Sequence, residues 1–223
     1  MQEALLKRIA AEVQVVRPEG RGQLLRRLSD LYLAARGKIE PACVDLFVSL
    51  AIDLLTRASL FERMAFANAI ADVGPPPPAL VDHVLKDAYL VARPLIERGE
   101  LSESRLLALM DDDAREVTHV MIAQRPNTGV PITDRLVADD RIKVLLALAA
   151  NASATLSEAA FEKLGALAVE RPDMDAALAH RADLPVAIAK NLHRRIGQSS
   201  AKRVHDMIAR DDLKRRTGYV LRS

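Results

Sequence analysis

The chain has 223 residues, half of them apolar, and a formal net charge of +2 at pH 7. A net charge this close to zero produces no global field that would require a polyanionic partner. The sequence has no Trp and only seven Tyr and Phe residues. This composition argues against a β-sandwich or barrel, and against an aromatic platform that stacks single-stranded nucleic acid. Its small and straight aliphatic side chains favour close helix packing.

Helical periodicity predicts four helices in the first 72 residues, with apolar stripes over 4–16, 24–32, 41–57 and 60–71. The third is apolar nearly all round and is expected to be a central helix. It contains Cys43, the single cysteine, which cannot form an internal disulfide. We expect this thiol to be buried and structural rather than a nucleophile.

Four consecutive prolines, Pro75–Pro78, follow Gly74 and interrupt the helical pattern. A linker or a ligand for SH3-type domains is one interpretation of such a run. Because helical signals resume at Leu80, we favour a rigid turn between two helical layers.

A weak internal repeat follows the prolines. The runs 106–127 (LLALMDDDAREVTHVMIAQRPN) and 134–153 (DRLVADDRIKVLLALAANAS) both contain an apolar helix end, an Asp-rich corner, a Val-centred helix and an Asn-containing turn. Looser copies cover 80–100 and 174–193. Short helical units that recur at a fixed register are typical of an α-solenoid, and solenoids usually bind partners rather than catalyse reactions.

The Asp residues before the second helix of each pair, Asp87, Asp111–Asp113 and Asp139–Asp140, are predicted to cap that helix, because a carboxylate accepts free backbone N–H groups there. Asp183 is predicted to cap a helix over 184–192 in the same way. Pro172 and Asp173 together predict a turn before that last pair.

Other positions in the repeat carry structural predictions of their own. Asn127 and Asn151 should end helices in a left-handed conformation. Val91, Val117 and Val144 occupy matching positions and should point inward. Two further predictions concern helix limits: Pro94 should shorten or kink its helix, and Ser199 or Ser200 should cap a final helix over 201–216.

The chain resembles a known family from Arg63 through His193. The matching segments are DHVLKDAYLVARPLIERGELSESRLLAL, HVMIAQRPNTGVPITDRLVADDRIKVLLALAANASATLSE and RADLPVAIAKNL. They are similar to an uncharacterised alphaproteobacterial helical-repeat family, domain of unknown function two-three-three-six. The resemblance implies an all-α fold of HEAT-like or leucine-rich-variant repeats and implies no reaction. We therefore expect an all-α, α-α superhelix, a HEAT-like solenoid of short helix pairs.

The motif search finds no catalytic, cofactor or metal signature. There is no P-loop, no G-x-G-x-x-G, no G-x-S-x-G and no pair of His residues at zinc-ligand spacing. Asp111–Asp113 could bind a metal, but the spacing of an EF-hand is absent and capping is the preferred interpretation. His119 is expected to be a satisfied or half-buried histidine. We predict a non-enzyme with no catalytic residue, no cofactor and no metal.

The C-terminal segment has a strong charge asymmetry. From Lys190 onward there are ten basic and three acidic residues, a net charge of +7. Such a segment could meet DNA, RNA, anionic lipid or an acidic protein face, or could be a solvated helix face with a basic tail. Its candidate polyanion-binding residues are Arg194, Arg195, Lys202, Arg203, Lys214, Arg215 and Arg216.

We expect four parts that share one continuous core: an N-terminal helical layer (1–74), a proline-rich turn (75–79), stacked repeats (80–197) and a basic C-terminal helix and tail (198–223). The expected function is a non-catalytic scaffold or regulatory adaptor that binds a protein or peptide. The alternative is a HEAT-like nucleic-acid-binding protein that uses the basic segment. With no signal-peptide core and no membrane span in the sequence, we predict a cytoplasmic location.

Overall fold

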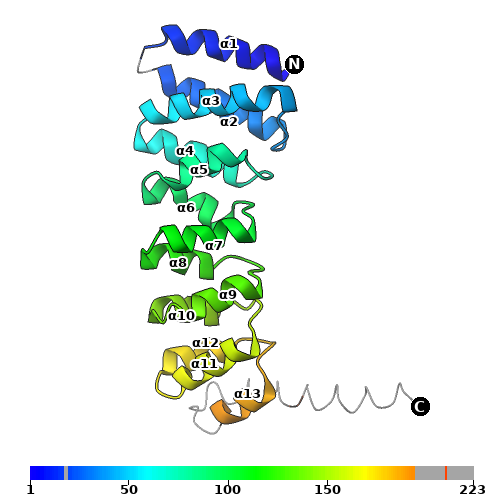
Figure 1. The fold of residues 1–223 in the computed structure, drawn as a ribbon, viewed down its shortest axis with the longest axis vertical. Coiled ribbons are helices and arrows are strands. Elements are labelled where there is room, and N and C mark those ends of the chain that lie inside the picture. The colour runs from blue at the N-terminus through cyan, green and yellow to red at the C-terminus, as the bar shows by residue number, and fades with distance from the viewer. Residues whose placement is uncertain (18–19, 194–208, 210–223) are drawn as a thin grey trace, which may run out of the picture. The chain divides into compact units, whose positions relative to one another are not determined.

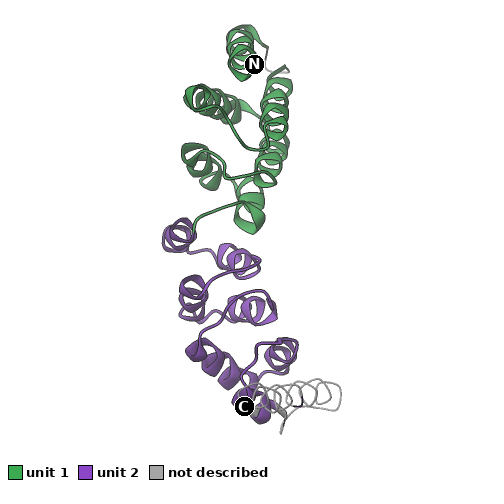
Figure 2. Cartoon of the chain, turned by 90° about the vertical axis from the view of Figure 1, so that its right-hand side faces the viewer, with its two compact units in different colours: residues 1–102 green, residues 103–223 purple. Residues whose placement is uncertain are grey.

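The computed structural model describes residues 1–17, 20–193 and 209, and every regular element in that part is a helix (Figure 1). Two compact units divide the chain, 1–102 and 103–223 (Figure 2). No helix among the described residues has both the length and the apolar character needed to cross a membrane. The first unit contains α1 (Gln2–Val15), α2 (Arg21–Ala34), the 3₁₀ turn η2 (Pro41–Cys43), α3 (Val44–Arg57), α4 (Leu60–Ala71), α5 (Pro78–Leu85) and α6 (Tyr89–Arg98). The second contains α7 (Glu103–Asp112), α8 (Glu116–Ala123), α9 (Val130–Val137), α10 (Ile142–Ala150), α11 (Glu158–Ala168), α12 (Pro172–Ala179) and α13 (Val186–His193).

In the first unit the four helices predicted for residues 1–72 are confirmed. Helix α4 packs against α2 and α6, while α3 packs against α1, α2 and α5. Tyr32 and Phe47 stack in this core with ring centroids 5.7 Å apart, and Cys43 is buried beside them as expected. The loops after α2 and α4 meet at Gly37 and Gly74, both with positive φ. A Cβ on Gly37 would lie 2.8 Å from the Val73 carbonyl oxygen, so this close approach requires glycine.

The prolines take a different place from the predicted one. Pro78 is the first residue of α5 and Pro77 is its N-cap, so the turn ends earlier than residue 79. Proline fits the first helical position because that N–H has no intrahelical partner. For the same reason Pro172 begins α12 instead of forming a turn. Pro94 lies inside α6 but does not shorten it, since the helix continues to Arg98.

The prediction that the Asp residues cap the second helices is wrong. The N-caps of α6, α8 and α10 are Ala88, Arg115 and Arg141, and none makes a side-chain capping bond. Asp113 instead accepts from the Arg115 guanidinium (Nη2 to Oδ2, 2.7 Å), and Asp139 likewise pairs with Arg141. An Asp two residues before an N-cap Arg is better placed to pair with its guanidinium than to cap the helix.

Two further Asp predictions at these corners are corrected. Asp87 lies one residue before its N-cap, accepts the Ala88 N–H and pairs with Arg63. Asp183 lies three residues before α13 and pairs with Arg181. In both cases the helix starts later than the apolar pattern suggested.

Register decides which residues point inward. Val91 and Val144 are fully buried as predicted, but Val117 is 39 % exposed. Both buried valines are the third residue of their helices; in α8 that position belongs to Thr118, and it is fully buried. The alignment of the repeats was therefore displaced by one residue at α8. Met174 holds the same position in α12 and is also fully buried.

Asn127 and Asn151 differ in backbone conformation. Asn127 has φ of +54°, the left-handed conformation that was predicted, but it lies in the loop beyond α8. Asn151 ends α10 with φ of −81°, so its left-handed assignment is wrong. Its side-chain amide instead donates to the carbonyl oxygens of Ala123 (2.8 Å) and Arg125 (2.6 Å) in the preceding pair. A polar side chain at one helix end thus satisfies carbonyls at the end of another.

The turn after α12 repeats this arrangement with a buried arginine. The Arg181 guanidinium donates to the carbonyl oxygens of Asn151 and Ala154, the latter at 2.6 Å, and it lies 5.4 Å from the Phe161 ring centroid. Its charge is balanced by Asp183 at 2.8 Å. Arg181 lies ten residues after the N-cap of α12, the same offset that separates Asn151 from Arg141.

A third polar contact set joins α8 to the α9–α10 corner. His119 is 3 % exposed, and its Nε2 lies 3.2 Å from the Met110 carbonyl oxygen and 3.1 Å from that of Asp113. Its Nδ1 faces Asp139, which also accepts from Arg141. The prediction that His119 is a satisfied histidine is confirmed.

We expect Arg181→Met to lower the free energy of unfolding by about 3 kcal/mol, because it leaves two buried carbonyl oxygens without donors. Urea unfolding of the full chain, followed by far-UV circular dichroism, measures the change. Arg135→Met is the matched control; both members of its ion pair with Asp111 are exposed (41 % and 66 %), so the loss should stay below about 1 kcal/mol. Equal losses in the two variants would contradict the role given to Arg181.

The Asp139 carboxylate predicts a pH dependence of stability. Hydrogen bonding from Arg141, and then the charge of His119, hold the pKa of Asp139 below its ordinary value. A folded-state pKa below the unfolded one stabilises the fold at neutral pH, and this contribution is lost as pH falls below about 4.

We therefore expect Asp139→Asn to cost about 3 kcal/mol at pH 7 and less at pH 3. Urea midpoints of both proteins at the two pH values measure this difference. A gap that stays constant between pH 7 and pH 3 would refute the assignment.

Candidate functional site

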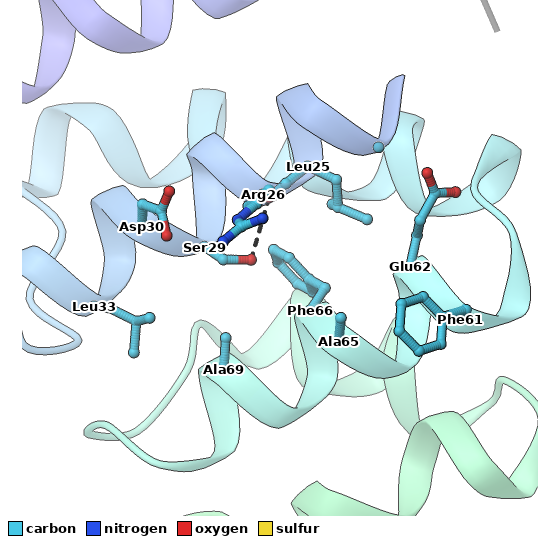
Figure 3. A pocket seen from close by; sticks show the side chains of 11 residues that line it. Leu25, Arg26, Ser29, Asp30, Leu33, Phe61, Glu62, Ala65, Phe66 and Ala69 are labelled. Atoms are coloured by element: carbon cyan, nitrogen blue, oxygen red, sulfur yellow. Dashed lines mark hydrogen bonds between the residues drawn. The ribbon is translucent and has the colours of Figure 1, made fainter. Parts of the chain in front are cut away.

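A groove of about 380 Å³ lies between α2 and α4 in the first unit (Figure 3). Phe61 and Glu62 lie at one end, whereas Leu33 and Ala69 lie toward the other, so the two helices run in the same direction. Gly22 faces Glu62 closely: a Cβ there would lie 1.7 Å from Glu62 Oε1. The absent side chain at Gly22 therefore lets the starts of the two helices approach each other.

The groove is lined mainly by apolar and small side chains. Leu25 and Phe66 are buried, and Gly22, Ala65 and Ala69 add little bulk above them. Ser29 also lines the groove, but its hydroxyl donates to the Leu25 carbonyl oxygen at 3.2 Å. Because that donor is already used within α2, the groove offers an incoming group mostly hydrocarbon surface.

Phe61 is the most exposed aromatic side chain of the described residues, at 79 %. It is the second residue of α4, whose start is fixed by a capping box in which Ser59 and Glu62 each bind the other's backbone N–H. Leu33, 38 % exposed, lines the opposite end of the groove. Exposed apolar side chains beside a groove are typical of interaction sites.

Three charged side chains also line the groove, and one of them, Glu62, is already engaged in the capping box with Ser59. Arg26 and Asp30 are both exposed and lie four residues apart on α2. In the part of the chain that the structure describes, neither of them makes an ion pair or a side-chain hydrogen bond. An Arg placed before an Asp is the less favourable order for pairing within a helix, so both charges stay available to a ligand.

A second hollow of the same unit is polar. It is lined by Leu55, Thr56, Arg63, His83, Lys86 and Asp87. Arg63 pairs with Asp87 at 2.8 Å and donates to the Ala58 carbonyl oxygen, also at 2.8 Å. Arg63 and Asp87 neutralise each other, while His83 and Lys86 make this hollow polar, in contrast to the apolar groove.

Several titratable groups in the described part of the second unit pair with one another and with backbone atoms. The His119 and Asp139 side chains are 3 % and 5 % exposed; His119 contacts the carbonyl oxygens of Met110 and Asp113, and Asp139 pairs with Arg141. Asp113 has its pKa lowered by hydrogen bonds from Arg115 and then Thr118, and Asp111 pairs with Arg135. Residues 1–17, 20–193 and 209 contain no group of three metal-ligating side chains.

The basic residues singled out from the sequence, Arg194, Arg195, Lys202, Arg203, Lys214, Arg215 and Arg216, lie outside the described residues, as does the proposed final helix cap at Ser199 or Ser200. The structure therefore does not test the predicted polyanion site. The sequence analysis also missed the α2–α4 groove. The available signal was Phe61, a large aromatic residue next to the predicted helix start, with Ala65 and Ala69 following at one-turn intervals.

Comparison with known proteins gives one match. No curated protein and no solved structure matches the chain. A family model described as "Uncharacterised protein conserved in bacteria (DUF2336)" matches residues 91–217, more than half of the chain. The matched range begins in α6 and includes the whole described part of the second unit. The chain therefore belongs to the DUF2336 family of bacterial proteins.

Proposed function

We propose that the protein is a non-catalytic interaction scaffold or adaptor whose α2–α4 groove binds a protein partner. The observation that carries the proposal is the groove itself: an apolar floor, small side chains at its centre and the 79 % exposed Phe61 at one end. A solvent-exposed phenylalanine costs hydration free energy in the free protein, and burial against a partner recovers it.

An α-α superhelix of HEAT-like repeats is the architecture that we infer for this scaffold. Within each unit, helices pack against the helix two positions later: α2 against α4, α4 against α6, α8 against α10, and α10 against α12. The N-cap arginines Arg115, Arg141 and Arg171 recur after 26 and 30 residues, which is the length of a short helix pair. Repeats of this kind provide extended binding surfaces.

A nucleic-acid-binding function is the second candidate. It is supported by the sequence of 194–223, which has nine basic and three acidic residues, a net charge of +6. Such a segment would bind phosphate backbones with an affinity that falls steeply with salt. The groove supports the first candidate more directly, because its lining is apolar and a polyanion gains little from such a surface.

Affinity purification from the native cells separates the two functions. We expect the tagged wild-type chain to retain a protein partner after nuclease treatment and at moderate salt, and Phe61→Ala to reduce the retained amount about tenfold, as truncating an aromatic anchor does. The matched control is Val169→Ala, which removes an exposed apolar side chain (44 %) from the second unit and should leave retention unchanged.

Two results would oppose the scaffold function at this groove. Equal retention by wild type and Phe61→Ala would exclude the groove as the binding surface. Loss of every partner on nuclease treatment, with nucleic acid co-purifying and binding that weakens steeply with salt, would favour the basic segment.

A further inference from the structure

We infer that the α2–α4 groove takes an amphipathic α-helix with an apolar stripe and, beside it, one acidic and one basic residue a single turn apart. This inference rests on the proposed interaction function and specifies the chemistry of the partner. It follows from the length of the groove, the shape of its floor and the pair of charges on α2.

The length of the groove matches a short helix. Its lining residues on α2 extend from Gly22 to Leu33, and those on α4 from Phe61 to Ala69. Eleven residue steps along α2 correspond to about 16 Å, or about three helical turns. A partner helix of three to four turns would therefore contact the full lining, including Phe61 at one end and Leu33 at the other.

The floor has the shape that helix packing needs. Gly22, Ser29, Ala65 and Ala69 are small residues that line the groove between α2 and α4, while Phe61 and Leu33 lie toward its opposite ends (Figure 3). A row of apolar side chains at i, i+3 or i+4, and i+7 on a partner helix fits such a groove as a ridge.

The two charged residues on α2 determine which charges the partner helix should carry beside its apolar stripe. Arg26 and Asp30 project from consecutive turns of the same helix, both are exposed, and neither pairs within the described residues. A carboxylate on the partner would pair with Arg26, and an ammonium or guanidinium group would pair with Asp30. Opposite charges across an interface fix orientation and register more than they add affinity, so this pair should select the direction of the bound helix.

The test uses two fluorescein-labelled helical peptides of 15 residues. Both carry Leu at i, i+4, i+7 and i+11; one has Glu four residues before Lys on the flank, and the other has the reverse order. Fluorescence anisotropy against the full-length wild-type protein should show a preference of about fivefold for one peptide, the effect of two exposed ion pairs. Phe61→Ala should weaken both peptides about tenfold.

The exchange variant Arg26→Asp/Asp30→Arg is the decisive protein, because it should reverse the preference between the two peptides. Val169→Ala serves again as the control and should bind as wild type does. Both substituted α2 positions and Phe61 are exposed, so thermal melts of the variants should match that of the wild type.

The possible failures are distinguishable from failure of the proposed function. Phe61-dependent binding with no peptide preference, or a preference that the exchange does not reverse, overturns the charged flank but leaves the groove as an interaction site. If neither peptide binds at protein concentrations up to about 1 mM, on the order of the weakest specific affinities, the helical occupant is overturned. Phe61-dependent partner retention still tests the scaffold function in that case. Self-association of the wild type that Phe61→Ala abolishes would assign the groove to a second copy and overturn the inference.

Discussion

The second unit depends on a requirement for hydrogen-bond donors at the ends of its short helices. Each helix leaves its last carbonyl oxygens without intrahelical partners, and helices of 8–11 residues create such ends at close intervals. Asn151 donates to the loop after α8, and Arg181 donates to the loop after α10. Since each donor is supplied by a later helix pair, the helix pairs stabilise each other in one register, and none would be satisfied alone.

Two carboxylates at the corners of the second unit have lowered pKa values. The carboxylates of Asp113 and Asp139 are held ionised by Arg115 and Arg141, at corners where the chain enters the next helix. His119 on α8 contacts the Asp139 carboxylate and so joins α8 to the corner before α10. Perturbed titration often identifies catalytic groups, but structural ion-pair networks perturb it as well. Here the Asp–Arg pairs stabilise the turns that precede α8 and α10.

The first unit differs in a way that suits binding. Helices α2 and α4 have 14 and 12 residues, and they contact each other through apolar packing, with Gly22 leaving room for the Glu62 side chain. A capping box fixes the start of α4, so Phe61 is presented on a rigid helix and not on a loop. An exposed aromatic side chain on a pre-ordered element loses little conformational entropy when a partner buries it. The groove therefore combines a defined shape with surface that water solvates poorly.

The sequence by itself determined the all-α class, the presence of the first four helices, the buried state of Cys43 and the satisfied hydrogen bonding of His119. These follow from apolar periodicity and helix stop signals, which are local. Only the tertiary structure decided the partners of the Asp corners, the inward position of Thr118 instead of Val117, the donor role of Arg181 and the α2–α4 groove. The carbonyl contacts of Arg181 join residues 30 and 27 positions apart and the groove joins α2 to α4, whereas Asp113 and Asp139 each pair with an Arg only two residues away. A one-residue error in register is invisible in the sequence, yet it is enough to exchange a buried position for an exposed one.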